Sequence, residues 1–157
     1  MTPELKTAAK VAAVSQIQNV RLTFVHSDLQ PGFEKVLNGK SEIQIDHRMT
    51  EYIVREDELQ LILEFKLKIV VESAEEKTAP QPGETSTPPL EIHAKFCVDY
   101  TVKDLKTFSE QDIQAFAKIN AVFNSWPYWR EIVQSTFWRM GLPPFVIPVF
   151  RMPLKSD

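Results

Sequence analysis

The chain has 157 residues, of which 43% are hydrophobic and 25% charged, and this composition suits one soluble domain spanning residues 1–157. The formal net charge of −3, without a run of basic residues, argues against binding to nucleic acid. A single cysteine, Cys97, excludes an internal disulfide. The lack of an apolar leader, or of about 20 consecutive apolar residues, predicts a cytoplasmic protein without membrane insertion.

Residues 6–15 are compatible with a short helix, and four strands are predicted after it. In each strand apolar and polar side chains alternate, which is typical of half-buried antiparallel strands with one face on a core. The alternating stretches are 19–26, 43–49, 59–72 and 91–103. In the first stretch, the side chains predicted to share one face are Val20, Leu22, Phe24 and His26.

Three connections separate the predicted strands. A long link covers residues 31–40, and the charged residues 55–58 predict a tight turn. Residues 73–89 are polar and rich in proline, which predicts a flexible loop. Because the fourth strand has the same pattern as the first three, we expect this loop to lie within one domain rather than between two.

The hydrophobic period changes after the fourth strand, and two helices are predicted. Ser109, with a carboxylate three residues later, is a helix-start signature, and apolar residues then recur at helical spacing. Pro127 cannot continue a straight helix, because it lacks an N–H and clashes with the preceding turn. Asn124 or Ser125 is therefore predicted to cap a second helix that has Pro127 in its first turn.

Gly141 and the two prolines after it predict the end of the second helix, and residues 142–157 are predicted to form an extended tail. The predicted fold class is therefore α+β: a four-stranded antiparallel sheet with two C-terminal helices on one face.

No arrangement of side chains in the sequence indicates catalysis. The three histidines do not stand at metal-ligand spacing: His26, His47 and His93. Cys97 alternates with apolar neighbours and is interpreted as a packed residue, and four glycines do not supply a phosphate-binding loop. Asp46, Glu64 and Asp99 share the polar strand face, but their spacing does not require them to meet. We therefore expect a protein that is not an enzyme and that holds no metal or cofactor.

All three tryptophans, Trp126, Trp129 and Trp138, lie in the last predicted helix, and their spacing does not place them on one helix face. A single sheet therefore cannot bury all three. The apolar residues interpreted as core and subunit interface are Trp126, Trp129, Ile132, Val133 and Phe137. The apolar tail at 144–150 adds surface that a monomer would not expose, which predicts self-association or a bound guest.

Four short segments together resemble a known family. They are 127–133 (PYWREIV), 140–144 (MGLPP), 147–150 (IPVF) and, on the second strand, 42–46 (EIQID). With the strand order and the long link, they are similar to the SecB family of cytoplasmic export chaperones over most of residues 18–150. The resemblance implies a SecB-like fold and a homotetramer built as a dimer of dimers.

The resemblance also implies a function, an ATP-independent holdase that binds unfolded polypeptides, in protein export or in the control of an antitoxin. By position, the client-binding residues would be Phe33, Val36, Ile43, Ile45, Phe145, Val149 and Phe150. The acidic positions through which export members contact SecA match Arg21 and Val25 here, which argues against SecA docking. From the residues alone, an alternative is a small apolar-ligand binding domain with a closed cavity between sheet and helices.

Overall fold

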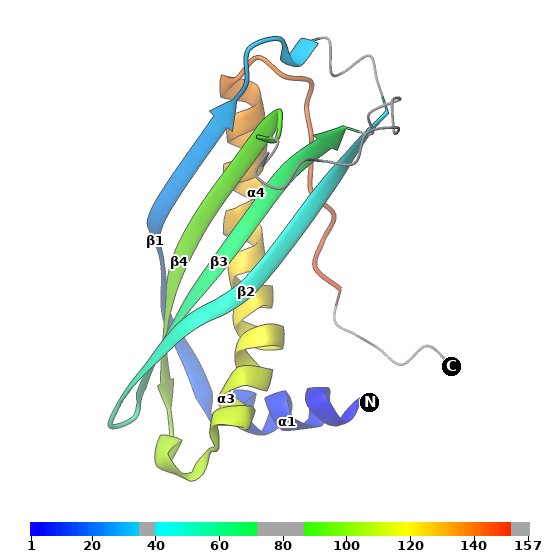
Figure 1. The fold of residues 1–157 in the computed structure, drawn as a ribbon. Coiled ribbons are helices and arrows are strands. Elements are labelled where there is room, and N and C mark those ends of the chain that lie inside the picture. The colour runs from blue at the N-terminus through cyan, green and yellow to red at the C-terminus, as the bar shows by residue number, and fades with distance from the viewer. Residues whose placement is uncertain (35–39, 72–86, 152–157) are drawn as a thin grey trace, which may run out of the picture.

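A computed structural model of the chain describes residues 1–34, 40–71 and 87–151 (Figure 1). A short helix precedes four strands, and a long helical stretch follows them. The elements are α1 (Pro3–Ala12), β1 (Ser15–Leu29), β2 (Ser41–Arg55), β3 (Glu58–Val71), β4 (Leu90–Val102), a 3₁₀ turn (Leu105–Thr107), α3 (Glu110–Phe116), a π turn (Ala117–Ala121) and α4 (Val122–Arg139). The predicted α+β class is confirmed.

The four strands form one antiparallel sheet in the order β1-β4-β3-β2, so β1 and β2 are its edges. The predicted tight turn between β2 and β3 is confirmed, with Glu56 in the left-handed region at φ 53°. The predicted link and loop fall largely outside the described residues, which omit 35–39 and 72–86.

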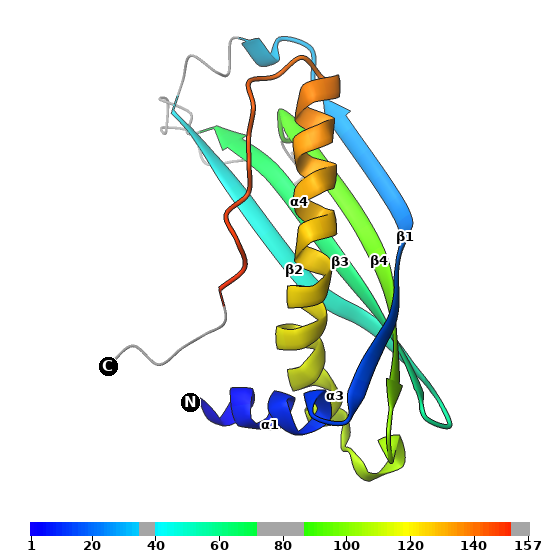
Figure 2. The same cartoon turned by 180° about the vertical axis from the view of Figure 1, so that it is seen from behind.

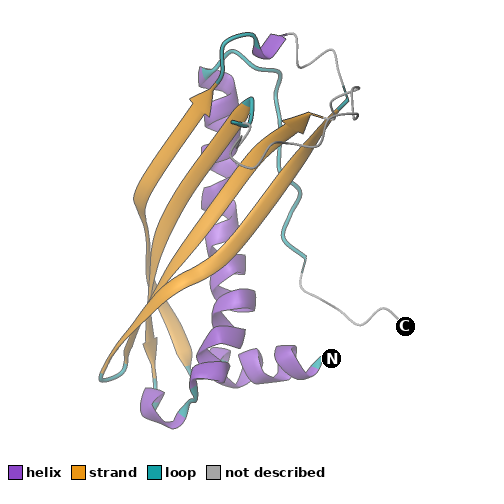
Figure 3. Cartoon of the chain, in the orientation of Figure 1, coloured by secondary structure: helices purple, strands orange, loops and turns teal. Residues whose placement is uncertain are grey.

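Helix α4 covers one face of the sheet, and the core lies between them (Figures 1 and 3). At its centre the Phe65 ring of β3 lies 5.6 Å, between ring centroids, from both Phe96 of β4 and Trp129 of α4. Trp129 is 0% exposed. Alternate residues of β3 and β4 are buried against this cluster because the strand period of two sends them all to the same face.

The predicted helix boundary at Asn124 or Ser125 is wrong, because Pro127 lies inside α4 and the two C-terminal helices, α3 and α4, meet at the π turn instead. The buried Ser125 hydroxyl donates to the Ala121 carbonyl at 2.8 Å rather than capping a helix. Asn124 Nδ2 donates to the Tyr100 hydroxyl of β4 at 2.9 Å. The Asn124 contact ties the helix to β4 at this point, and the helix continues although proline removes one main-chain hydrogen bond.

The ends of the helical stretch follow the sequence signals. Ser109 and Asp112 form the predicted capping box at the start of α3. At the end of α4, Gly141 adopts φ +68°, its N–H donates to the Trp138 carbonyl, and the Leu142 N–H donates to the Phe137 carbonyl. This pair of hydrogen bonds is a Schellman motif, and it turns the chain back along the helix.

Strand β1 departs from simple alternation. Register shifts between Ile17 and Asn19 and between Leu22 and Phe24 insert extra residues. Leu22 pairs with Phe96 on the helix side of the sheet, whereas Phe24 pairs with Lys95 on the opposite, open side. The prediction that Val20, Leu22, Phe24 and His26 share one face is therefore wrong at the last two positions.

Helix α1 begins and ends three residues earlier than predicted and packs against α3 and the π turn. Lys118 Nζ lies 2.8 Å from Glu4 Oε1 across this contact. Among the described helices, none has the length and apolar character needed to cross a membrane.

Candidate functional site

After α4, residues 142–151 form an extended segment, which we call the tail. Figure 2 shows the tail running back beside α4, on the side of the helix that faces β2, while β1 lies on the other side. The tail belongs neither to a helix nor to the sheet. Its position therefore depends on contacts with the side chains of α4 and β2.

Two side chains of α4 hold the main chain of the tail. Trp126 Nε1 donates to the Pro148 carbonyl at 2.8 Å, and Arg130 Nε donates to the Ile147 carbonyl at 2.8 Å. The donors stand four residues apart and so share one face of the helix. Because every residue carries a main-chain carbonyl, these contacts do not depend on which side chains the bound segment has.

Apolar contacts complete the attachment of the tail. The Phe150 ring lies 5.3 Å from Trp126 and 5.8 Å from His47, between centroids, and Phe145 stacks on Phe137 at 5.2 Å. Ile147 is 1% exposed. The surface that receives the tail, here called the tail-binding surface, consists of His47 of β2 and Trp126, Arg130 and Phe137 of α4.

The tail-binding surface contains one histidine, His47, and its surroundings shift its pKa. Burial lowers its pKa below the ordinary value, and the nearby charge of Asp46 opposes that effect only in part. Burial therefore favours the neutral form of the ring. In this form it contributes an apolar edge to the rings of Trp126 and Phe150.

The residues predicted to bind a client are spread along this region. Ile43 and Ile45 are half-buried. They lie on the same face of β2 as His47, which is the face that turns to α4. Phe33 is buried and lines a pocket of about 400 Å³ with Met140 and Leu142, where the tail begins. Val36 lies outside the described residues. In the tail, Phe145 and Phe150 are half-buried, whereas Val149 is 61% exposed.

The contacts that His47 and Arg130 make with the tail have no signal in the sequence. Arg130 reaches a carbonyl 17 residues away and His47 reaches a ring more than 100 residues away, so no local spacing marks either contact. The segment 127–133 contains Arg130, but the family resemblance gave it no role.

The five residues interpreted as core and interface lie in the core of the single chain. Trp126, Trp129, Val133 and Phe137 are buried and Ile132 is half-buried. Trp138 is 80% exposed, so the tryptophans do divide between two sides of the helix as their spacing predicted. Phe123 and Tyr128 are also exposed on α4.

An exposed apolar strip lies on β1. Ile17, Leu22 and Val25 point to the helix side of the sheet, since their partners in β4 are core residues. They are nonetheless exposed, because α4 lies over β3 and β4 and leaves β1 beside it (Figure 2). The strip follows an edge strand of 15 residues.

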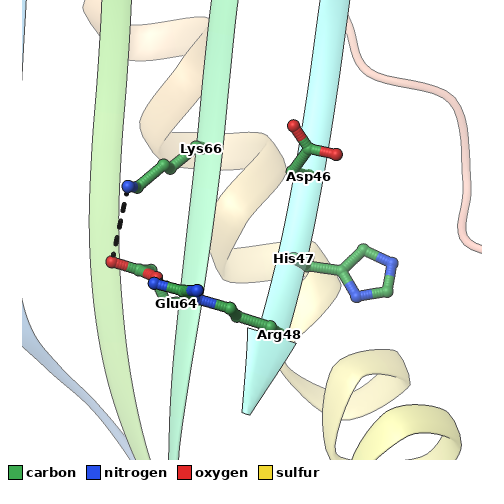
Figure 4. A pocket seen from close by; sticks show the side chains of 5 residues that line it. All are labelled: Asp46, His47, Arg48, Glu64 and Lys66. Carbon is green, nitrogen blue, oxygen red and sulfur yellow. Dashed lines mark hydrogen bonds and ion pairs between the residues drawn. The ribbon is translucent and has the colours of Figure 1, made fainter. Parts of the chain in front are cut away.

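The open face of the sheet carries a charged cluster around Glu64, which is 6% exposed (Figure 4). Arg48 Nε donates to Glu64 Oε2 at 2.6 Å, His93 Nε2 lies 2.7 Å from Oε1, and Lys66 Nζ lies 3.7 Å from Oε1. Burial raises the pKa of the Glu64 carboxyl. The hydrogen bond from Arg48 and the charges of Lys66 and Arg48 outweigh it and bring the pKa below its ordinary value. Glu64 is thus an ionised carboxylate held by cations.

Asp46 lines the same pocket as Glu64, whereas Asp99 belongs to a separate group of contacts (Figure 4). Asp99 pairs with Arg21 at 2.8 Å and accepts from Gln60 at 2.9 Å. Cys97 is buried beside them, and burial together with the Asp99 charge raises the pKa of its thiol. Both effects disfavour the thiolate, which is the nucleophilic form of cysteine.

Comparison with solved structures identifies the fold. A SecB-like chaperone of Mycobacterium tuberculosis, solved in complex with a peptide from an antitoxin, matches with a TM-score of 0.70 and 16% identity, over 95% of this chain and 99% of that one. The chain therefore has the SecB-like fold, as the resemblance implied. A protein of unknown function from Streptococcus agalactiae matches at a TM-score of 0.39 with 8% identity, over 85% of this chain and 96% of that one. The sequence matches no family model and no curated protein.

Proposed function

We propose that this protein is an ATP-independent holdase that binds unfolded polypeptides. The observation that carries the proposal is the fold match, over nearly the whole of both chains, to a chaperone that holds a peptide. The tail adds support, because this chain already presents a surface that holds an extended apolar segment by its main chain.

Binding without a nucleotide would rest on the burial of apolar side chains. Each side chain that a client buries fully contributes about 1.5–3 kcal/mol, so a few contacts suffice for capture and none has to be specific. A folded protein escapes because its apolar side chains are already buried. Of the residues named from the resemblance, we propose that the client contacts Phe33, Val36, Ile43 and Ile45, and that the tail residues Phe145, Val149 and Phe150 mark the position of its binding surface.

The proposal includes a homo-oligomer, a tetramer built as a dimer of dimers. Two uncovered apolar surfaces favour it, the strip of Ile17, Leu22 and Val25 on β1 and the exposed aromatic side chains of α4. Natural proteins rarely leave a long edge strand with apolar side chains uncovered. Several binding surfaces in one assembly would also raise the avidity for a long client.

The type of client divides into two possibilities, an antitoxin or a protein destined for export from the cytoplasm. The solved chaperone holds an antitoxin peptide, which favours the first. Docking to SecA is disfavoured, because Arg21 is paired with Asp99 and Val25 is an exposed apolar residue. Neither supplies the acidic contact that the resemblance associates with the motor.

The alternative function, binding of a small apolar ligand in a closed cavity, has less support. In the described part of the chain, side chains fill the space between the sheet and α4. Trp129, Phe65 and Phe96 are among the largest of them, and each is nearly or fully buried. Light-scattering mass also separates the two proposals, since a monomer would favour the ligand-binding domain and an oligomer the chaperone.

A capture experiment tests the holdase proposal. Reduced, carboxymethylated α-lactalbumin remains unfolded in buffer, and its native disulfide-bonded form is a matched folded control. We expect the unfolded form to co-elute with this protein in size-exclusion chromatography without nucleotide, and the native form to elute alone. Separate elution of the unfolded form at micromolar concentrations would refute the proposal.

A further inference from the structure

We propose that tail residues 145–150 occupy the site that an unfolded client uses, and that a client binds by displacing them. The tail would then be a built-in competitor rather than a fixed wall of the binding site. This inference rests on the proposed holdase function, and it assigns Trp126 and Arg130 as the residues that bind the client main chain.

The first argument is the way in which the tail is held. Trp126 and Arg130 both donate to main-chain carbonyls, and these carbonyls belong to consecutive residues, Ile147 and Pro148. An unfolded client offers carbonyls at the same spacing in any extended stretch. The same two donors therefore suit a ligand whose sequence is not fixed, as a holdase requires.

The second argument is the composition of the tail itself. Residues 144–150, PFVIPVF, are wholly apolar and extended, so they have the chemistry of an exposed segment of an unfolded protein. Phe145 and Phe150 contact aromatic rings of α4, and Ile147 is buried. Val146 and Val149 are exposed. A client segment with apolar side chains at a similar spacing would make equivalent contacts with Phe137, His47 and Trp126.

The third argument is that the tail can leave without removing a strand or a helical turn. Its departure uncovers the part of the core that Ile147 fills, which the apolar side chains of a client would cover again. The tail contributes no rung to the sheet and no turn to a helix, and its exit from α4 is completed by the Schellman motif at Gly141 before the bound residues begin. The donors left behind, Trp126 Nε1 and Arg130 Nε, would be paired again by the client. Displacement thus exchanges one extended segment for another of like chemistry.

The consequence is measurable, because a bound competitor lowers the apparent affinity for the client by the fraction of molecules in which the site is free. A substitution that weakens the tail, without altering α4 or β2, must therefore tighten client binding. Phe150→Ser removes the ring that contacts His47 and Trp126. Val149→Ser is the matched control, because Val149 belongs to the same segment but is largely exposed.

The experiment measures the dissociation constant of fluorescein-labelled, carboxymethylated α-lactalbumin by anisotropy, with the parent protein and both variants. We expect Phe150→Ser to bind about threefold or more tightly than the parent, and Val149→Ser to bind like the parent. Unchanged or weaker binding by Phe150→Ser, at an unchanged melting temperature, would overturn the inference and make the tail part of the wall. No binding by any of the proteins would instead overturn the holdase proposal itself.

A second measurement keeps the inference testable if Phe150→Ser is unstable. The synthetic peptide PPFVIPVF, which reproduces residues 143–150, is titrated into the parent protein holding the labelled client. We expect the peptide to release the client, and we expect Trp126→Phe, which keeps an aromatic ring but loses the indole donor, to weaken the binding of both the client and the peptide. Failure of the peptide to release any client at millimolar concentration would contradict a shared site.

Discussion

Trp129 is the side chain that ties α4 most closely to the sheet. It is fully buried against Phe65, and its Nε1 has no hydrogen-bond partner within the described part of the chain. Trp129→Ala should lower the free energy of unfolding by about 3–5 kcal/mol, because it leaves a large cavity. Trp129→Phe should cost clearly less, since it keeps a ring and removes an unpaired buried donor. Urea unfolding measures both, and a change of less than about 1 kcal/mol for the alanine variant would contradict this packing.

Glu64 should give the fold a dependence on acid pH. Its pKa is lowered in the folded state, so its contribution to stability is present above the ordinary carboxyl pKa of 4.5 and is lost as the pH falls through the folded value. Glu64→Gln cannot ionise, so its stability should fall less than that of the parent between pH 5 and strongly acid pH.

Melting temperatures across this range measure the difference. Glu58→Gln, changed at an exposed position at the start of β3, controls for the loss of one negative charge. Parallel pH profiles for Glu64→Gln and the parent would show that the cations around Glu64 do not stabilise its charged form.

At the scale of single elements, the continuity of α4 through Pro127 is the feature most open to test. Alanine is favoured over proline in a helix interior by about 3 kcal/mol, and the loss of proline's restriction on the unfolded chain offsets up to about 1 kcal/mol. Pro127 is exposed, so its replacement removes little buried surface. Pro127→Ala should therefore raise the free energy of unfolding by about 2–3 kcal/mol. A lower value would mean that Pro127 begins a helix, as the sequence alone suggests.

The elements differ in how far the sequence determines them. Strands β3 and β4 were predictable because every second residue, such as Leu61, Leu63 and Phe65, faces the core. The cap at Ser109 and the exit at Gly141 were also predictable, since each is a local signal. Neither the bulge that moves Phe24 to the open face nor the passage of α4 through Pro127 has such a signal, because packing against distant residues decides both.

The candidate site was predictable only in its position along the chain. The apolar tail and the family resemblance both pointed to residues 142–150. The contacts that hold the tail join Trp126 to Pro148 and His47 to Phe150, which are far apart in sequence. Their pairing follows from the direction in which the Schellman motif sends the chain, and that geometry is set by the folded helix rather than by a pattern of residues.

For the molecule as a whole, the uncovered strip on β1 predicts self-association. Leu22 is exposed on the helix side of the sheet, so Leu22→Asp should cost a monomer little but should disrupt an interface. We expect Leu22→Asp to reduce the mass in light scattering, whereas Asn19→Asp, at an exposed polar position of the same strand, keeps the parent's mass. Equal masses for both variants and the parent would exclude the β1 strip as the interface.

The central claim is that this protein holds unfolded polypeptides by mass action alone. Its most direct test dilutes a chemically unfolded, aggregation-prone client into buffer containing an equimolar amount of the protein and no nucleotide, and follows light scattering. The predicted result is that scattering is strongly suppressed, and more so as the ratio of protein to client rises. Scattering that follows the same course with and without the protein would contradict the claim.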